Sequence, residues 1–264
     1  MTATPLRVRR EPPAFRRVEV RRVERLTPRM VRATLAGPDL EGFAVDQPAA
    51  SVRLLLPSGG DDGLVMPAWN GNEFLLPDGR RPAIRTFTPR RFDSSALELD
   101  LDIVLHGRGA ASSWAATAEP GAALAISGPG RGYAIDGEAP AFLLAGDETA
   151  IPAIGQLLEA IPADRVVDVH VEVADPDARL PLPRHPGVTV DWHDLPAGAP
   201  PGDALVAAVL GVELGPDTRV WVAGEAAAVQ RIRKHLFQEL GIARPLTTVR
   251  GYWKHGRAGD ADDD

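Results

Sequence analysis

The stretch AFLLAGDETAIPAI, residues 141–154, decides the fold of this chain. Its first five residues form an uninterrupted apolar run, which is typical of a strand buried on both faces of a parallel sheet. From Ile151 to Leu158 apolar side chains recur at helical spacing. Asp147 or Thr149 can cap that helix, and Pro152 suits its first turn, where a missing N–H costs nothing. The stretch therefore predicts a buried strand, a tight turn and a helix.

The same rhythm continues towards the C-terminus. The sequence predicts further strands at residues 167–173, 188–192, 219–223 and 246–253, and helices at residues 203–210 and 225–240. Strands that alternate with helices predict a parallel sheet with helices on both faces.

The residues before Pro140 follow another pattern. Strands are predicted at residues 15–23, 30–35, 51–56 and 97–105, with Gly and Pro in the turns between them. One short helix is expected, with Ser112 or Ser113 as its cap and Trp114 to Ala118 as its body. This pattern is typical of an antiparallel sandwich or barrel. We therefore expect a β-barrel in residues 1–137, an α/β domain in residues 138–256 and a disordered acidic tail in residues 257–264.

Composition narrows the function. The chain has 264 residues, no cysteine and a formal net charge of −7. Iron–sulfur clusters and thiolate metal sites are excluded, so an organic cofactor must carry any electrons. The negative charge argues against general nucleic-acid binding. The opening MTATPLRVRR has no apolar core, so we expect no secretory signal, and no apolar run approaches a membrane span.

The segment RTFTPR, residues 85–90, combines groups that a flavin dinucleotide needs. A cation can meet the pyrophosphate, a flat ring can lie against the flavin, and a small hydroxyl can approach its reactive nitrogen. Strand alternation puts Arg85 and Phe87 on one face and Thr86 and Thr88 on the other. Taken alone, the segment also fits an ordinary edge strand with solvated arginines.

The segment LHGRGAASSWA, residues 105–115, leads a Gly-containing turn into a helix start. Free N–H groups at a helix N-terminus suit a phosphate. A plain strand–turn–helix explains the segment equally well, with His106 as a structural histidine.

Two strand ends in the second half carry Gly and polar residues, Gly146 to Ala150 and Gly224-Glu225. Because α/β sheets bind ligands at the carboxyl ends of their strands, these ends can cradle a nicotinamide dinucleotide. The G-x-G-x-x-G fingerprint is missing, so routine αβ connections remain an alternative. The closing RGYWKHG, residues 250–256, offers a stacking wall and an anion clamp, or else an amphipathic last strand.

In this order and spacing, the segments resemble the siderophore-interacting family of flavin-binding reductases. The resemblance covers about residues 15–256 and includes FRRVEVRRVERLTPRMVRATL, the Gly128-Pro129-Gly130 turn and WVAGE. It implies a six-stranded antiparallel FAD-binding β-barrel followed by an NAD(P)H-binding α/β domain. It further implies a cytoplasmic protein, which we expect to be a monomer, that takes hydride from NAD(P)H through FAD and reduces the Fe(III) of a ferric siderophore to Fe(II). We expect no membrane partner, no resident metal and no catalytic acid or base.

The resemblance also assigns roles to residues. The expected FAD ligands are Arg85, Thr86, Phe87, Thr88, Asp102, Val104, His106, Gly109, Ala111, Ser112, Ser113 and Trp114. The expected NAD(P)H ligands are Gly146, Asp147, Glu148, Thr149, Ala150, Gly224 and Glu225. The expected siderophore ligands are Arg53, Arg131, Trp253 and Lys254.

Two departures from the family pattern bear on these roles. Phe87 stands where the family usually has Tyr, so ring stacking survives but a phenolic hydrogen bond does not. Asp194 lies near a position where many members carry a basic residue, which leaves NADPH or NADH open. The alternatives are another NAD(P)H:flavin or quinone-type reductase, a ferredoxin-fed siderophore reductase and a non-catalytic siderophore-binding protein.

Overall fold

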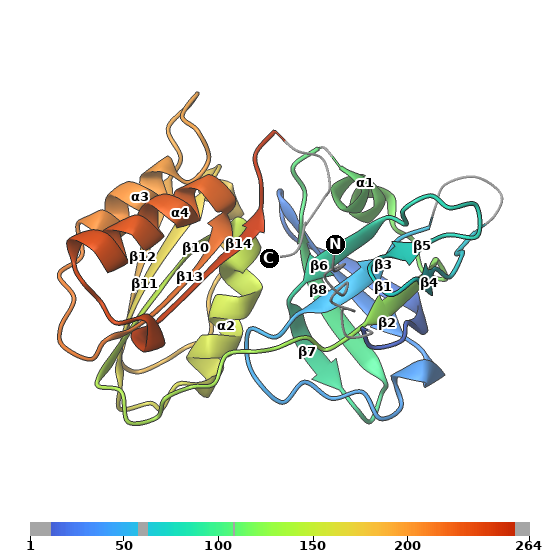
Figure 1. The fold of residues 1–264 in the computed structure, drawn as a ribbon, viewed down its shortest axis with the longest axis horizontal. Coiled ribbons are helices and arrows are strands. Elements are labelled where there is room, and N and C mark those ends of the chain that lie inside the picture. Colours follow the sequence, from blue (N-terminus) through green and yellow to red (C-terminus); the bar gives the residue numbers. More distant parts are fainter. Residues whose placement is uncertain (1–11, 58–62, 108, 257–264) are drawn as a thin grey trace, which may run out of the picture.

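The computed structural model describes residues 12–57, 63–107 and 109–256, so the predicted acidic tail lies outside the described residues. Two sheets lie side by side (Figure 1), an antiparallel sheet from the N-terminal half and a parallel sheet from the C-terminal half. The fold class expected from the sequence is confirmed. Among the described residues, no helix is long and apolar enough to cross a membrane.

The antiparallel sheet has the strand order β6-β3-β9-β1-β2-β8-β7. Its strands are β1 (Arg16–Thr27), β2 (Met30–Ala36), β3 (Val52–Leu55), β6 (Ile84–Phe87), β7 (Pro89–Asp93), β8 (Glu98–Val104) and β9 (Ala123–Ser127). The two edge strands β6 and β7 are consecutive in the chain, with only Thr88 between them. If β6 and β7 are counted as one bent strand, that strand joins both edges of a six-stranded sheet. A small hairpin of β4 (Ala68–Trp69) and β5 (Phe74–Leu75) lies outside the sheet.

Strand alternation builds the core of this half. On β8, Leu99, Leu101 and Ile103 are almost fully buried, whereas Asp100 and Asp102 lie between them on the other face. The strict alternation of residues 97–105 thus appears as a strand with one apolar and one polar face.

The parallel sheet has the order β12-β11-β10-β13-β14. Its strands are β10 (Ala141–Asp147), β11 (Val166–Val173), β12 (Val188–Asp194), β13 (Arg219–Glu225) and β14 (Thr247–Trp253). Helix α2 (Ile151–Ala160) lies between this sheet and the barrel, and α3 (Asp203–Leu210) and α4 (Ala226–Lys234) cover the far face (Figure 1). On β10, Leu144 belongs to the core on the α2 side and Leu143 to the core under α3 and α4, as expected of a strand buried on both faces.

Helix α2 connects the two halves. The Gln156 side chain accepts a hydrogen bond from the backbone N–H of Ala49 (2.9 Å) and donates one to the carbonyl of Pro89 (2.6 Å). Arg90 forms a bidentate ion pair with Glu159, with N–O distances of 2.6 and 3.1 Å. Side chains of α2 therefore hold the β7 end of the RTFTPR segment.

Two helix predictions need correction. Helix α1 spans Ala110–Thr117 with Gly109 as its cap, so Ser112 lies inside the helix rather than before it. The predicted helix 225–240 ends as an α-helix at Lys234 and continues as a π-helical turn, His235–Glu239. The π-helical turn was not visible in the apolar spacing, because that spacing differs little between an α-helical and a π-helical winding over one turn.

Candidate functional site

The RTFTPR segment forms the bend that closes the barrel. Phe87 on β6 pairs with Val52 on β3, while Pro89 on β7 already pairs with Leu101 on β8. The chain therefore changes partner strand at Thr88, which is 7% exposed. A bend of this kind lets side chains from both strands surround one ligand.

Arg85 offers a cation at this bend. Its guanidinium donates one hydrogen bond, to the carbonyl of the neighbouring Ile84 (2.6 Å). Within the part of the chain that the structure describes, Arg85 forms no ion pair with a carboxylate. Phe87 is half-buried and packs on the barrel core, and Thr86 is exposed. A half-buried cation without a carboxylate partner suits an anionic ligand such as a pyrophosphate.

The bend also contacts the C-terminal strand. The side chains of Thr88 and Tyr252 form a hydrogen bond, which acts to lower the pKa of Tyr252, although burial raises that pKa more strongly. The sequence analysis gave Tyr252 no role of its own. Its place in the closing aromatic run was the available signal, but only the docking of β14 against the barrel reveals its partner.

The turn before α1 is held by Ser112. This buried hydroxyl accepts hydrogen bonds from the backbone N–H groups of His106 (3.0 Å) and Gly107 (3.2 Å). The N–H groups of Ala110 and Ala111 lie in the first helical turn and have no acceptor inside the helix. The first turn of α1 thus presents backbone N–H donors beside the end of β8, the geometry that favours phosphate.

The remaining FAD candidates around α1 and β8 differ in exposure. Ser113 and His106 are exposed, while Ala111 and Trp114 are half-buried and pack on the barrel core. Val104 is half-buried against the core of the second half, at the junction of the two sheets.

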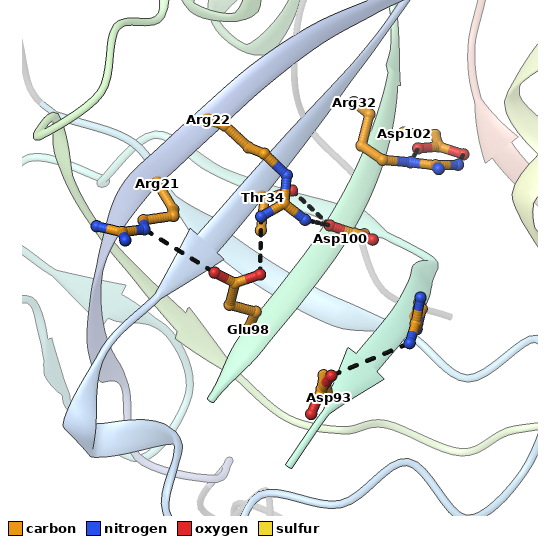
Figure 2. A network of polar contacts seen from close by, with 9 residues as sticks. Arg21, Arg22, Arg32, Thr34, Asp93, Glu98, Asp100 and Asp102 are labelled. Atoms are coloured by element: carbon orange, nitrogen blue, oxygen red, sulfur yellow. Dashed lines mark hydrogen bonds and ion pairs between the residues drawn. The ribbon is translucent and has the colours of Figure 1, made fainter. Parts of the chain in front are cut away.

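Asp102 is already engaged within the barrel. Its carboxylate receives two hydrogen bonds from Arg32, at 2.7 and 2.8 Å. Figure 2 shows this pair at one end of a row of charges, with Arg22 facing Glu98 and Asp100 further along. An Asp102 carboxylate that is buried and paired in this way supports the strand and leaves Arg32 as the more exposed group.

Asp147 organises the carboxyl end of the parallel sheet. One carboxylate oxygen accepts hydrogen bonds from the Thr149 backbone and hydroxyl, and the other from the Glu225 N–H (2.8 Å) and the Trp253 indole N–H (2.7 Å). Burial raises the pKa of Asp147, and these hydrogen bonds act against that rise. Asp147 therefore links the ends of β10, β13 and β14.

The carboxylates of Glu148 and Glu225 also accept hydrogen bonds from groups within the protein. Glu148 pairs with Arg29 of the β1–β2 turn (3.0 and 3.1 Å) and accepts from the Ala174 N–H (2.8 Å). Glu225 caps α4 through Ala227 and Ala228 and accepts the N–H of His255 (3.0 Å). The sequence analysis missed Glu172 at the end of β11, whose carboxylate accepts hydrogen bonds from the Gly202 and Leu205 N–H groups at the start of α3.

Two glycines permit this packing. A Cβ on Gly146 would lie 2.3 Å from the Ala150 side chain and 2.7 Å from the Ala223 carbonyl oxygen. A Cβ on Gly224 would lie 2.6 Å from an Asp147 carboxylate oxygen. The carboxylates of Asp147, Glu148 and Glu225 already accept hydrogen bonds from the protein. The carboxyl ends of β10 and β13 therefore offer a ligand mainly backbone groups and small, closely packed residues.

The siderophore candidates lie near both regions. Arg53 on β3 pairs in register with Thr86 of β6. Arg131 and Lys254 are exposed, and the Arg131 carbonyl accepts a hydrogen bond from Arg250 of β14 (3.4 Å). Trp253, by contrast, is tied to Asp147.

A surface hollow of about 780 Å³ lies elsewhere, beside the edge strand β12. Its lining includes Leu180, Leu182 and Trp192. It is separate from the predicted cofactor segments. Near its rim, Arg179 pairs with Asp194 at 2.7 Å, so a basic residue does stand beside the position where the family pattern departs.

Comparison with known proteins identifies the family. Residues 19–133 match the siderophore-interacting FAD-binding domain model, and residues 139–256 match the siderophore-interacting protein model. The chain belongs to the siderophore-interacting protein family. The resemblance stated from the sequence is thereby confirmed, and the N-terminal half is an FAD-binding domain of that family.

Several relatives span nearly the whole chain. The ferric vibriobactin reductase ViuB of Vibrio cholerae is 31% identical over 236 residues, which cover 88% of this chain and 86% of ViuB. A siderophore utilization protein from T. fusca has a TM-score of 0.83 and 36% identity, covering 94% and 95% of the two chains. The siderophore-interacting protein SipS from Aeromonas hydrophila has a TM-score of 0.76 and 32% identity, with 93% of each chain covered.

A more distant likeness concerns the fold alone. The ferredoxin reductase in carbazole 1,9a-dioxygenase is 15% identical with a TM-score of 0.65, and the match covers 92% of this chain and 70% of the reductase. The barrel and the parallel sheet are therefore arranged as in that reductase.

Proposed function

We propose that this protein is a flavin-dependent ferric-siderophore reductase, in which residues 1–137 bind FAD and residues 138–256 bind NAD(P)H. The observation that carries the proposal is the 31% identity with a ferric vibriobactin reductase over most of both chains, together with the FAD-binding domain in the N-terminal half. The cytoplasmic location and the monomeric state stay predictions.

The barrel bend fits FAD. Arg85 brings a half-buried cation that pairs with no carboxylate among the described residues, and the first turn of α1 brings backbone N–H donors, so both suit the two phosphates of FAD. Phe87 supplies a ring, and Thr88 a hydroxyl held by Tyr252. When bound, FAD accepts a hydride and returns electrons singly, which is the chemistry that a two-electron donor and Fe(III) require. Among the other FAD candidates, Asp102 is paired with Arg32, and we assign it a role in supporting the sheet rather than in contacting FAD.

The carboxyl edge of β10 and β13 is the proposed nicotinamide site. Its carboxylates already accept internal hydrogen bonds, so we assign contact with NAD(P)H to the backbone of Gly146, Thr149, Ala150 and Gly224. Asp147, Glu148 and Glu225 act as positioning residues that fix this backbone. The nicotinamide and the flavin must lie close together. The contacts of β14 with the barrel, such as the hydrogen bond between Tyr252 and Thr88, hold the two proposed sites next to each other.

Basic residues suit an anionic ferric chelate. Arg53 neighbours the flavin strand, and Arg131 and Lys254 are exposed where β14 meets the barrel. Fe(II) is held less tightly than Fe(III) by hard oxygen ligands, so reduction loosens the chelate. Lys254 and Arg131 would attract the chelate, and the Trp253 ring can lie against it.

A spectroscopic titration tests the proposal. The purified protein is expected to be yellow, or to become so with added FAD, and to bleach when NADPH or NADH is added without oxygen. A ferric siderophore should then restore the colour. A yellow protein that neither nicotinamide bleaches contradicts the NAD(P)H assignment and favours a ferredoxin-fed reductase. A colourless protein that takes up no FAD overturns the reductase and favours a siderophore-binding protein.

A further inference from the structure

A cluster of histidine and aspartate side chains lies at the outer edge of the parallel sheet, away from β14 and the barrel. Asp168 and His170 come from β11, and Asp191 and His193 come from the edge strand β12. The register pairs His170 with Asp191. All four residues lie on one face of the sheet, because residues two apart on a strand share a face and paired neighbours match.

The cluster has the spacing of a metal site. One ligand atom each from Asp168, His170 and Asp191 lies within 4.8 Å of the others. The Nε2 atom of His170 is 3.3 Å from a carboxylate oxygen of Asp168. An ion placed among these atoms would meet one imidazole nitrogen and two carboxylates, a donor set suited to first-row divalent transition metals.

His170 is held for this role. Its side chain is 9% exposed, and its Nδ1 atom lies 2.9 Å from Nε2 of His193. The two rings are nearly parallel, with an interplanar angle of 23°. If Nδ1 carries the proton and donates it to His193, Nε2 is left free as a ligand. Metal-binding histidines in proteins are oriented by such a hydrogen bond from the second ring nitrogen.

The two carboxylates lack the arginine partners that are common elsewhere in this chain. Across residues 12–57, 63–107 and 109–256, neither Asp168 nor Asp191 pairs with an Arg or Lys, whereas Asp194 close by on β12 pairs with Arg179. Two neighbouring carboxylates without a cation repel each other, and a bound divalent ion removes that repulsion. Asp191 is exposed and Asp168 partly so, which gives an ion access.

We propose that Asp168, His170 and Asp191 bind one divalent transition-metal ion, with His193 as the positioning residue. The sequence analysis predicted no metal, because the three ligands are separated by up to 23 positions and only the pairing of β11 with β12 brings them together. The proposal does not rest on the reductase function, since the site lies on the far edge of the sheet and is read out by metal binding.

Calorimetric titration of the full FAD-loaded chain with Zn²⁺ tests the site. We expect one saturable Zn²⁺ per chain. Asp191→Asn should weaken binding by about tenfold or more, and His170→Gln should do the same. Asp191 is exposed, so its variant is expected to fold even if the buried His170 variant does not. No saturable binding to the wild type, or wild-type affinity in Asp191→Asn, overturns the site.

His193 provides the sharper test. His193→Phe should weaken Zn²⁺ binding by about 10- to 100-fold. His193→Gln, whose amide oxygen can accept the same hydrogen bond, should restore most of the affinity. Equal loss in both variants removes the positioning role. His235→Gln is the matched control, because His235 pairs with Glu239 at 2.8 Å and belongs to no three-ligand group among the described residues. The Zn²⁺ affinity of this variant should stay at the wild-type value.

Discussion

The barrel bend and the carboxyl edge of the parallel sheet both carry residues that the sequence marks for cofactor binding, but they use those residues differently. At the bend, the Arg85 guanidinium donates a hydrogen bond to the neighbouring Ile84 carbonyl and, among the described residues, pairs with no carboxylate. At the sheet edge, Asp147, Glu148 and Glu225 are buried and accept hydrogen bonds from the protein itself. The bend can therefore bind through side chains, whereas the edge uses side chains to shape its backbone.

The largest expected effect is on stability, when the Asp147 carboxylate at the carboxyl edge of the parallel sheet is removed. Asp147→Ala removes the acceptor of the Glu225 and Trp253 N–H groups, and leaving buried donors unsatisfied should cost about 3 kcal/mol or more of unfolding free energy. Urea denaturation followed by circular dichroism measures this. The control is Asp175→Ala. It removes the exposed carboxylate that accepts a hydrogen bond from the Asp177 N–H, and it should lower the free energy of unfolding by about 1 kcal/mol or less. Equal costs would mean that Asp147 is not a framework residue.

Removing the Arg85 side chain at the barrel bend should affect FAD binding rather than stability. Arg85→Ala is expected to weaken FAD by about 10- to 100-fold, because a charge-assisted contact contributes about 1.5–3 kcal/mol. Fluorescence titration of the apoprotein with FAD gives the dissociation constant. Arg91→Ala, an exposed neighbour 4.0 Å from Asp93, serves as control and should bind FAD normally. An Arg85 variant with wild-type affinity would remove the contrast between the two regions.

The next expected effect concerns Glu172, another buried carboxyl at the carboxyl edge of the parallel sheet, and is seen in the pH dependence of stability. Burial raises the pKa of this carboxyl above its usual value near 4.3. The folded protein then holds the proton more tightly than the unfolded chain, so the contribution of Glu172 to stability falls as pH rises from about 4.3 through the folded pKa. Relative to Glu172→Gln, the wild type should lose at most about 1.4 kcal/mol per pH unit there. A parallel pH profile for both proteins would contradict this.

The smallest expected effect concerns exposed charges between the two regions. The double variant Arg131→Ala with Lys254→Ala should raise KM for an anionic ferric chelate by about fivefold, or about 1 kcal/mol, and leave FAD bound. The difference should shrink at high salt, because exposed charges are screened. Steady-state reduction at two ionic strengths measures it. Unchanged kinetics with an anionic chelate would remove these residues from the site.

The sequence predicted the course of the fold because its patterns are local. Alternation in residues 97–105 and the apolar run from Ala141 depend only on neighbouring residues, and both appear as β8 and β10. The place of Ser112 was predicted less well. It looked like a cap, but it lies inside α1, and its hydroxyl accepts hydrogen bonds from the His106 and Gly107 N–H groups of the preceding turn. A local pattern shows that a polar group needs a partner without showing which partner it finds.

By itself, the sequence determined the two sheets and the family, and it marked the segments that we propose for cofactor binding. Only the tertiary structure decided how those segments use their charges. Arg29 and Glu148 are 119 positions apart, yet they form an ion pair across the junction of the two halves. Asp168 and Asp191 come together across two strands and, within the described residues, pair with no arginine. The reason is physical: an ionic contact depends on the distance between side-chain atoms, and that distance is set by strand order and sheet docking, which no neighbouring residue encodes.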